Sequence, residues 1–372
     1  MSDGFELRLD GIGKTYGATT VLEDISLTVG PGQVLGLTGP SGAGKTTICR
    51  LISGIEKPTV GSVWIGGADV TDTPTQTRGV AYMFESYALY PQLTVVDNIA
   101  FPLRSPINRG RYGKAEIERR VQEVLDLSEL TGLGGRLPGE LSGGQKQRVA
   151  LCRALVQEPS VWLLDEPISH LDAKLRNKLR GLIRRRQIAT DRPTIWTTPD
   201  ATEATSVADV VVVLIDGRIH QHGAPEDIYL RPVSTKVARL VGDPAMNLLS
   251  GKLHREDGTL IFEHEAMRQA LPPALDRRIQ EGTQGSGVVL GIRPNAISFH
   301  DPDQPANGST ISAQVYAWEP FGKYAIVSVR IGSDLIKIKT DRTNPFEINS
   351  TIPLSFDADG LVAFDETTGN AI

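Results

Sequence analysis

At 372 residues the chain is long enough for two domains, and its 40% hydrophobic and 22% charged residues are ordinary for a globular protein with a real core. The net charge of −5 argues against a general nucleic-acid binder, because such proteins usually carry a basic excess. The chain begins without a signal pattern, and no window approaches the run of about 18 apolar residues typical of a membrane-spanning helix. We therefore expect a cytosolic protein, or one held at a membrane only by a partner. Cys49 and Cys152 lie in helical patterns and are expected to be small buried side chains rather than a disulfide.

The first 30 residues alternate as β-strands do, with Phe5, Leu7 and Leu9 on one face. Tyr16 follows, ahead of a glycine-rich segment. Its ring could stack on a purine, since every base offers a π-face. Taken alone, an ordinary strand residue is the simpler interpretation of Tyr16.

The segment that begins at Gly39 reads G-P-S-G-A-G-K-T and fits the phosphate-loop pattern G-x-x-x-x-G-K-[ST] without exception. It follows an apolar run, Val34–Thr38, that predicts a buried strand, and it opens a helix that we expect over 46–53, ended by Gly54. The glycines let backbone N–H groups turn toward phosphate oxygens, and the helix start adds partial positive charge. A glycine-rich turn with a stray lysine is disfavoured, because the whole motif is present in its required context. The residues expected to bind nucleotide phosphates here are Gly39, Pro40, Ser41, Gly42, Ala43, Gly44, Lys45, Thr46 and Thr47.

Within this loop, Lys45 is expected to reach the β- and γ-phosphates, and the Thr46 hydroxyl to bind Mg²⁺. Further on, apolar runs at 61–67 and 80–84 predict strands, and the second run ends at Glu85. Residues 104–114 are rich in Arg, Gly and Pro and predict a loop. A helix is expected over 115–130, with its apolar positions at Ile117, Val121, Val124 and Leu125.

The next motif is Leu141-Ser142-Gly143-Gly144-Gln145. Ser142 is expected to cap the helix that follows. A small, glycine-rich helix start is a potential anion site, although a plain capped helix explains the segment equally well when it stands alone.

The apolar run 161–164 ends in two adjacent carboxylates, Asp165 and Glu166, and predicts a buried strand whose tip carries acidic groups. Side chains alternate along a strand, so one carboxylate can face Mg²⁺ and the other an attacking water. An acidic turn is the weaker alternative, given the phosphate loop upstream. Further strands are expected at 195–198, which ends at Pro199, and at 210–215, which closes in a hairpin.

From about residue 236 short strands recur between Gly, Pro, Asn and Asp residues, which predicts a small β-barrel or sandwich domain. This region contains no catalytic constellation. Its histidines, His254, His264 and His300, are expected to be lone surface residues rather than metal ligands. The expected strands are 287–291, 312–318, 325–331, 335–340 and 352–356.

Together these segments resemble the nucleotide-binding subunits of ABC transporters, and Tyr16 takes the place of the family's base-stacking aromatic residue. The segments 86–91, 291–294 and 361–365 are similar to the maltose/glycerol-phosphate importer ATPases within that family. The matching motifs are Walker A (39–46), the signature (Leu141, Ser142, Gly143, Gly144 and Gln145), Walker B (161–166) and the D-loop (169–172).

The resemblance implies an α/β P-loop NTPase fold, that is, an ABC ATPase domain with a helical subdomain over residues 1–236. A β-rich, OB/TOBE-like regulatory domain over residues 237–372 follows it. The implied cofactors are ATP and Mg²⁺, with Thr46, Asp165 and Glu85 at the metal and Glu166 as the general base.

The resemblance also implies a dimer in which the phosphate loop of one ATPase subunit faces the signature of the other. Two membrane permease subunits, one of which docks on residues 87–91, and an extracytoplasmic solute-binding protein complete the implied transporter. The chain would then be peripheral, on the cytoplasmic face of the inner membrane. No nucleic-acid partner is implied, because an OB-type fold alone does not license one.

Two residues depart from the family pattern. The family has glutamine at the position of Glu85 and histidine at the position of Pro199. Glutamate can still bind Mg²⁺, but it places a negative charge beside a polyanion and lacks the amide donors. Proline has no side-chain donor and no backbone N–H. Losing one preorganised donor at a developing charge typically costs about 10²–10³ in rate, so we expect hydrolysis at this Walker site to be impaired.

We therefore expect the energising subunit of an importer for a carbohydrate or polyol, with glycerol as one candidate. It would pair with a different, fully equipped ATPase subunit and supply its signature to the competent site. The alternatives are a homodimer with two slow sites, a subunit that binds ATP without turnover, and a soluble ABC ATPase acting on DNA or ribosomes. The single ATPase domain, the absence of a long heptad run and the acidic balance disfavour the last alternative.

Overall fold

The structure is a computed structural model that describes residues 6–279, 287–300, 310–342 and 344–372. The chain divides into two compact units, Met1–Pro225 and Glu226–Ile372, which are described separately below. No helix within the described residues is long and apolar enough to cross a membrane.

The first unit contains a six-stranded sheet in the order β10-β9-β3-β8-β7-β6, in which only β10 runs antiparallel to its neighbour. All residues of β3, β7 and β8 are buried, as expected for parallel strands covered on both faces. The strands are β3 (Val34–Thr38), β6 (Val80–Met83), β7 (Val161–Asp165), β8 (Thr194–Thr198), β9 (Val210–Ile215) and β10 (Arg218–Gly223).

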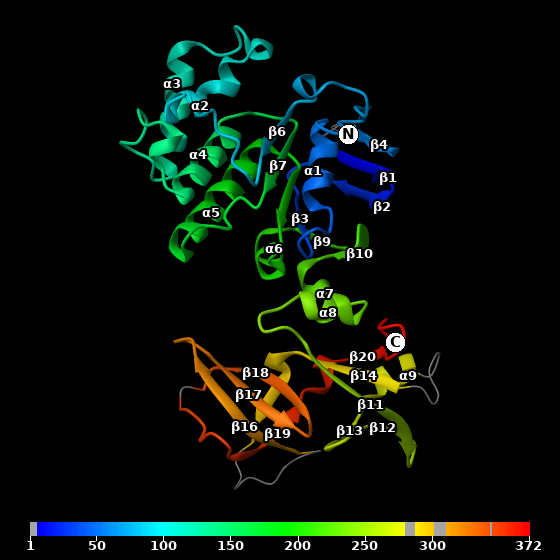
Figure 1. Ribbon diagram of the computed structural model, residues 1–372. Helices are drawn as coiled ribbons and strands as arrows, with labels where there is room; N and C mark the ends of the chain where they lie inside the picture. Colours follow the sequence, from blue (N-terminus) through cyan, green and yellow to red (C-terminus); the bar gives the residue numbers. More distant parts are fainter. Residues whose placement is uncertain (1–5, 280–286, 301–309, 343) are drawn as a thin grey trace. The chain divides into compact units, whose positions relative to one another are not determined.

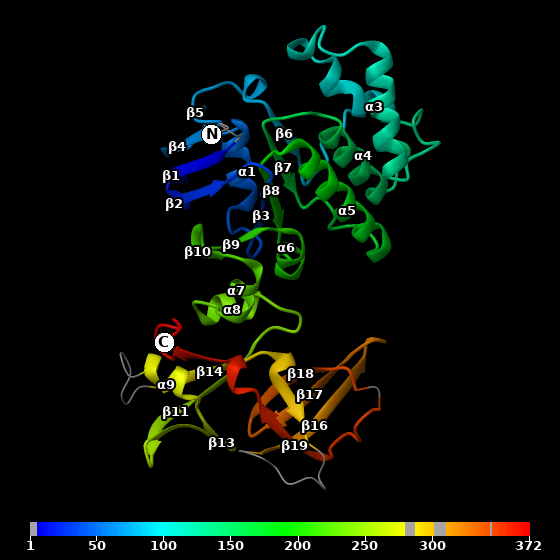
Figure 2. The same ribbon diagram turned by 180° about the vertical axis from the view of Figure 1, so that it is seen from behind.

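A second, antiparallel sheet in the same unit has the order β2-β1-β4-β5. Helix α1 (Lys45–Ser53) lies between the two sheets, and a single apolar core joins it to both of them (Figure 1, Figure 2). The strands of this sheet are β1 (Leu7–Tyr16), β2 (Thr19–Val29), β4 (Val60–Ile65) and β5 (Ala68–Asp69).

Helices α2, α3 and α4 pack together around a separate apolar core, away from the antiparallel sheet (Figure 1). The predicted apolar stripe of α3 is buried at all four positions, which confirms that helix. The expected loop at 104–114 contains a short 3₁₀ turn, Pro106–Asn108. The helices are α2 (Val95–Ala100), α3 (Lys114–Leu127), α4 (Gly143–Leu155), α5 (Ala173–Thr190) and α6 (Ala201–Val207).

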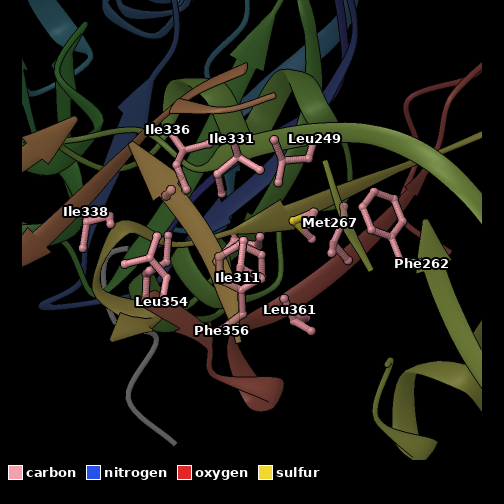
Figure 3. Packing of buried hydrophobic residues seen from close by; sticks show 14 of the residues in the cluster. Leu249, Phe262, Met267, Ile311, Ile331, Ile336, Ile338, Leu354, Phe356 and Leu361 are labelled. Carbon is pink, nitrogen blue, oxygen red and sulfur yellow. The ribbon is translucent and has the colours of Figure 1, made fainter. Parts of the chain in front are cut away.

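The second unit contains two antiparallel five-stranded sheets, β13-β12-β11-β14-β20 and β15-β19-β16-β17-β18. Side chains from both sheets form one apolar core (Figure 3). The elements are α7 (Pro225–Leu230), α8 (Thr235–Leu240), β11 (Asn247–Glu256), β12 (Thr259–His264), β13 (Met267–Ala270), α9 (Pro273–Ile279), β14 (Gly287–Ile292), β15 (Ile297–Phe299), β16 (Ile311–Pro320), β17 (Ala325–Ile331), β18 (Asp334–Thr340), β19 (Thr351–Phe356) and β20 (Leu361–Asp365).

The five strands expected in this region are all present, and both cysteines are free and buried as expected. The prediction for His264 was wrong. This side chain is buried, and its Nε2 lies 2.8 Å from the Asp334 carboxylate of β18, 70 residues away in sequence. The expectation for Phe5 lies outside the described residues.

Candidate functional site

The phosphate loop joins β3 to α1, and its backbone requires glycine at two positions. Gly39 has φ 155°, and a Cβ atom there would lie 1.9 Å from the Leu214 carbonyl oxygen of β9. Gly44 has φ 107°, and a Cβ atom there would lie 2.5 Å from the Leu22 side chain of β2. The close approach of two neighbouring strands therefore explains these glycines, in addition to any contact with phosphate.

Lys45 begins α1, and its buried side chain folds back over the loop. Its Nζ donates to the carbonyl oxygens of Gly39 (2.7 Å) and Pro40 (3.0 Å). Burial lowers the pKa of the ammonium group, whereas the carboxylates of Glu166, Asp165 and Glu85 act in the opposite direction. The cation is thus held inside the loop at the place where the sequence predicts phosphate oxygens.

Asp165 ends β7 with only 1% of its surface exposed. Its Oδ1 accepts a hydrogen bond from the Thr197 hydroxyl of β8 at 2.5 Å, and its Oδ2 accepts one from the Tyr82 hydroxyl of β6 at 3.1 Å. Burial raises the pKa of the Tyr82 phenol. Hydroxyl donors from both neighbouring strands therefore hold the carboxylate in one orientation.

Glu166 follows directly and adopts a left-handed backbone conformation, with φ 49°. Its N–H donates to the Thr197 carbonyl oxygen at 3.1 Å, and its own carbonyl accepts from Gln147 Nε2 at 3.0 Å. These bonds hold a conformation that non-glycine residues disfavour. The Glu166 side chain is half-buried, whereas that of Asp165 is almost fully buried, so the two carboxylates differ in their exposure to solvent.

Burial raises the pKa of the Glu166 carboxyl, and the Glu85 carboxylate raises it further. A carboxylate with a raised pKa is a better proton acceptor near neutral pH. The geometry can therefore place a base beside the phosphate loop, although the same arrangement gathers three negative charges around Lys45.

Pro199 directly follows β8, two residues after the threonine that binds both Asp165 and Glu166. The side chain is exposed. This edge of the sheet thus brings Glu85, Asp165, Glu166 and Pro199 together from the ends of three strands, β6, β7 and β8, but Pro199 offers no hydrogen-bond donor to it.

Magnesium fits this site only together with a nucleotide. Within the described residues, no group of three or more His, Cys, Asp or Glu side chains could hold a metal ion. Mg²⁺ usually takes one or two protein oxygens and completes its shell with phosphates and water, which suits Thr46, Asp165 and Glu85. When bound, the ion would neutralise phosphate charge.

The predicted signature forms the start of α4. Ser142 Oγ accepts from the Gln145 N–H (3.3 Å), and Gln145 Oε1 accepts from the Ser142 N–H (2.8 Å), which is a complete capping box. Leu141 is buried in the core shared by α2, α3 and α4, whereas Ser142 and Gly143 are exposed. The start of α4 is therefore exposed. It is anchored in the core of α2, α3 and α4, and not in the core that supports the phosphate loop.

Family models match most of the chain: the ABC transporter model at residues 22–169, the MalK OB fold domain model at 242–297 and the TOBE domain model at 290–364. The uncharacterized ABC transporter ATP-binding protein YurJ of Bacillus subtilis is 36% identical over 98% of this chain and 99% of its own. The trehalose/maltose import ATP-binding protein MalK of Thermococcus litoralis is 38% identical over 98% and 99%, respectively. The chain belongs to the ATP-binding subunits of ABC transporters. The Fe(3+) ions import ATP-binding protein FbpC of Photobacterium profundum is 39% identical to this ABC subunit over 83% and 84% of the two chains.

Solved structures agree with this membership. The dimeric post-hydrolysis structure of the ATP-binding cassette MJ0796 with ADP and Pi is 29% identical, has a TM-score of 0.55, and covers 59% of this ABC subunit and 98% of its own chain. A structure of the ATP binding subunit of an ABC transporter is 30% identical, has a TM-score of 0.55, and covers 60% and 91%, respectively. The expected fold, an ABC-type P-loop NTPase with OB and TOBE domains, is confirmed.

The structure also shows a hydrogen-bond network in this ABC subunit that sequence reasoning missed. Tyr87 and Ala88 both have positive φ, 64° and 44°, and the buried Arg153 of α4 donates to their carbonyl oxygens at 2.7 and 2.8 Å. The Tyr87 hydroxyl lies 3.1 Å from His170 Nδ1 in the predicted D-loop. The sequence carried no signal for this network, because its partners lie 65 to 83 residues apart.

Proposed function

We propose that this chain energises an importer for a carbohydrate or polyol, with glycerol as one candidate. A MalK-type OB match supports this proposal, and so do the matches to a trehalose/maltose and an sn-glycerol-3-phosphate import subunit, each of which spans 98% of this chain. Residues 1–236 would form the ATPase part and residues 237–372 the regulatory part, since the OB match begins just beyond this boundary, at residue 242.

In this proposal the chain lies peripherally on the cytoplasmic face of the membrane. It binds two permease subunits, and through them an extracytoplasmic solute-binding protein, but no nucleic acid. Tyr16 and the phosphate loop bind ATP, and Thr46, Asp165 and Glu85 bind Mg²⁺.

The chain's own Walker site hydrolyses ATP poorly in this proposal. The observation that carries it is the group of three carboxylates around Lys45 beside a proline that cannot donate. Glu85 adds a negative charge where the γ-phosphate is expected, and no histidine at position 199 stabilises charge that develops there. The loss of one such donor lowers the rate of hydrolysis about 10²–10³-fold, and we expect the loss of both to lower it further.

The intact capping box at Ser142 and Gln145 supports the second half of the proposal, in which the signature completes the competent site of a non-identical ATPase partner. Each partner would then contribute what the other lacks. A homodimer with two slow sites is the alternative.

The test is the ATPase rate of the purified chain alone, with Lys45→Ala as the control for contaminating activity. We expect turnover close to this control. The double variant Glu85→Gln/Pro199→His should gain more than about 10² in rate, since it restores two donors. Brisk turnover by the unpaired wild-type chain would refute the heterodimer, and a double variant without gain would show that the defect lies elsewhere.

A further inference from the structure

Tyr16 lies at the end of β1 and is 43% exposed, so part of its ring is open to a ligand. The Lys14 ammonium lies 4.7 Å from the centre of this ring. The Lys14 side chain is only 14% exposed, and its Nζ also donates to the Lys57 carbonyl oxygen at 2.8 Å. A fixed cation therefore lies over the ring, and the exposed part of the ring remains for a stacking partner.

Glu56 holds the edge of the same ring. The Tyr16 hydroxyl donates to the Glu56 carboxylate, which also pairs with Lys14 at 3.5 Å. Its other oxygen lies 3.3 Å from Arg50, in the last turn of α1. The Glu56 side chain is mostly buried, and the backbone N–H of Glu56 donates to the Arg50 carbonyl oxygen at 3.2 Å. Helix α1 begins at the phosphate loop, so this group of charges ties the tyrosine ring to the phosphate site.

We propose that Lys14, Glu56 and Arg50 are positioning residues that fix Tyr16 as a nucleobase platform at a set place relative to the phosphate loop. The inference rests on the proposed ATP site and goes beyond it, because it assigns the positioning of the Tyr16 ring to three residues outside the nucleotide motifs. A ring that is ordered before the ligand arrives saves the cost of immobilising it on binding. We therefore expect these three residues to strengthen the binding of ligands that carry a base, and not the binding of a phosphate chain alone.

The test compares ATP with inorganic tripolyphosphate, which carries the phosphate chain without a base. Both are titrated calorimetrically with Mg²⁺ against wild type, Lys14→Met and Glu56→Ala. We expect each variant to weaken ATP binding about three- to tenfold, in keeping with the ordering cost of one side chain, and to leave the tripolyphosphate Kd within about twofold. Lys14→Arg should bind ATP as wild type does, since a guanidinium also stacks on an aromatic ring.

The matched control is Lys57→Met, which removes the same charge from a neighbouring lysine. Lys57 is exposed and pairs with Asp72 rather than with the ring. It should change neither Kd, and thermal melting of each variant confirms folding. Equal weakening of ATP and tripolyphosphate by Lys14→Met would show simple charge attraction and overturn the inference, as would no weakening at all. A wild-type chain that binds neither ligand would overturn the proposed function itself, and the inference with it.

Discussion

Thr197→Val should destabilise the first unit, because it removes one of the two hydroxyl donors to a carboxylate that is almost fully buried. Valine has nearly the shape of threonine, so the change leaves no cavity. A hydrogen bond to a charged group contributes about 1.5–3 kcal/mol, and Asp165 would keep only its bond from Tyr82. We expect a loss of about 2 kcal/mol, which lowers the Tm by roughly 4–8 °C for a unit of this size.

Tryptophan fluorescence during thermal unfolding reports mainly on this unit, because three of the four tryptophans lie in it and two of these, Trp162 and Trp196, are buried in β7 and β8. The control is Thr194→Val, a buried threonine of the same strand whose hydroxyl makes only a 3.5 Å contact with a backbone oxygen. It should shift the Tm by less than half as much. Equal Tm values for Thr197→Val and wild type, or equal losses in the two threonine variants, would refute the role assigned to this donor.

The remaining predictions concern Glu85 and Pro199, which depart from the family pattern, and Arg153, which bonds to the turn at 87–88. Glu85→Gln, made in a Pro199→His background to give measurable turnover, removes a negative charge that raises the pKa of Glu166. The base then stays deprotonated to lower pH, so the acid limb of the pH–rate profile should move to lower pH; an unchanged limb would contradict this. Arg153→Met should raise hydrogen exchange in the turn at 87–88, since a left-handed residue costs roughly 1–2 kcal/mol without its support. Ala88→Gly should restore protection, because glycine adopts positive φ freely, and exchange that stays high would count against the support.

The phosphate loop and the strands could be predicted from sequence because their causes are local. A loop that turns successive N–H groups inward needs glycine at fixed spacing, and a doubly covered strand needs a continuous apolar run. Gly39 and Val34–Thr38 carry both signals within a dozen residues. The capping box of the signature is equally local, since Ser142 and Gln145 lie three residues apart.

The departures at Glu85 and Pro199 were also visible in the sequence, because each lies at a fixed place in a recognisable motif. The effect of Glu85 on the neighbouring charged groups was not visible. The shared charge around Lys45 depends on three strand ends that meet at one sheet edge, and the order of strands in a sheet follows from packing rather than from residue patterns.

The sequence alone determined that this chain contains a phosphate loop, an ABC signature and a β-rich tail, because backbone geometry and hydrophobic period act over a few residues. Only the tertiary structure decided that Tyr82 and Thr197 share the carboxylate of Asp165, and that Glu56 joins Tyr16 to helix α1. Tyr82 and Thr197 lie 83 and 32 residues from Asp165, and Tyr16 lies 40 residues from Glu56. Hydrogen bonds and ion pairs over such separations require a folded chain to bring their atoms within reach.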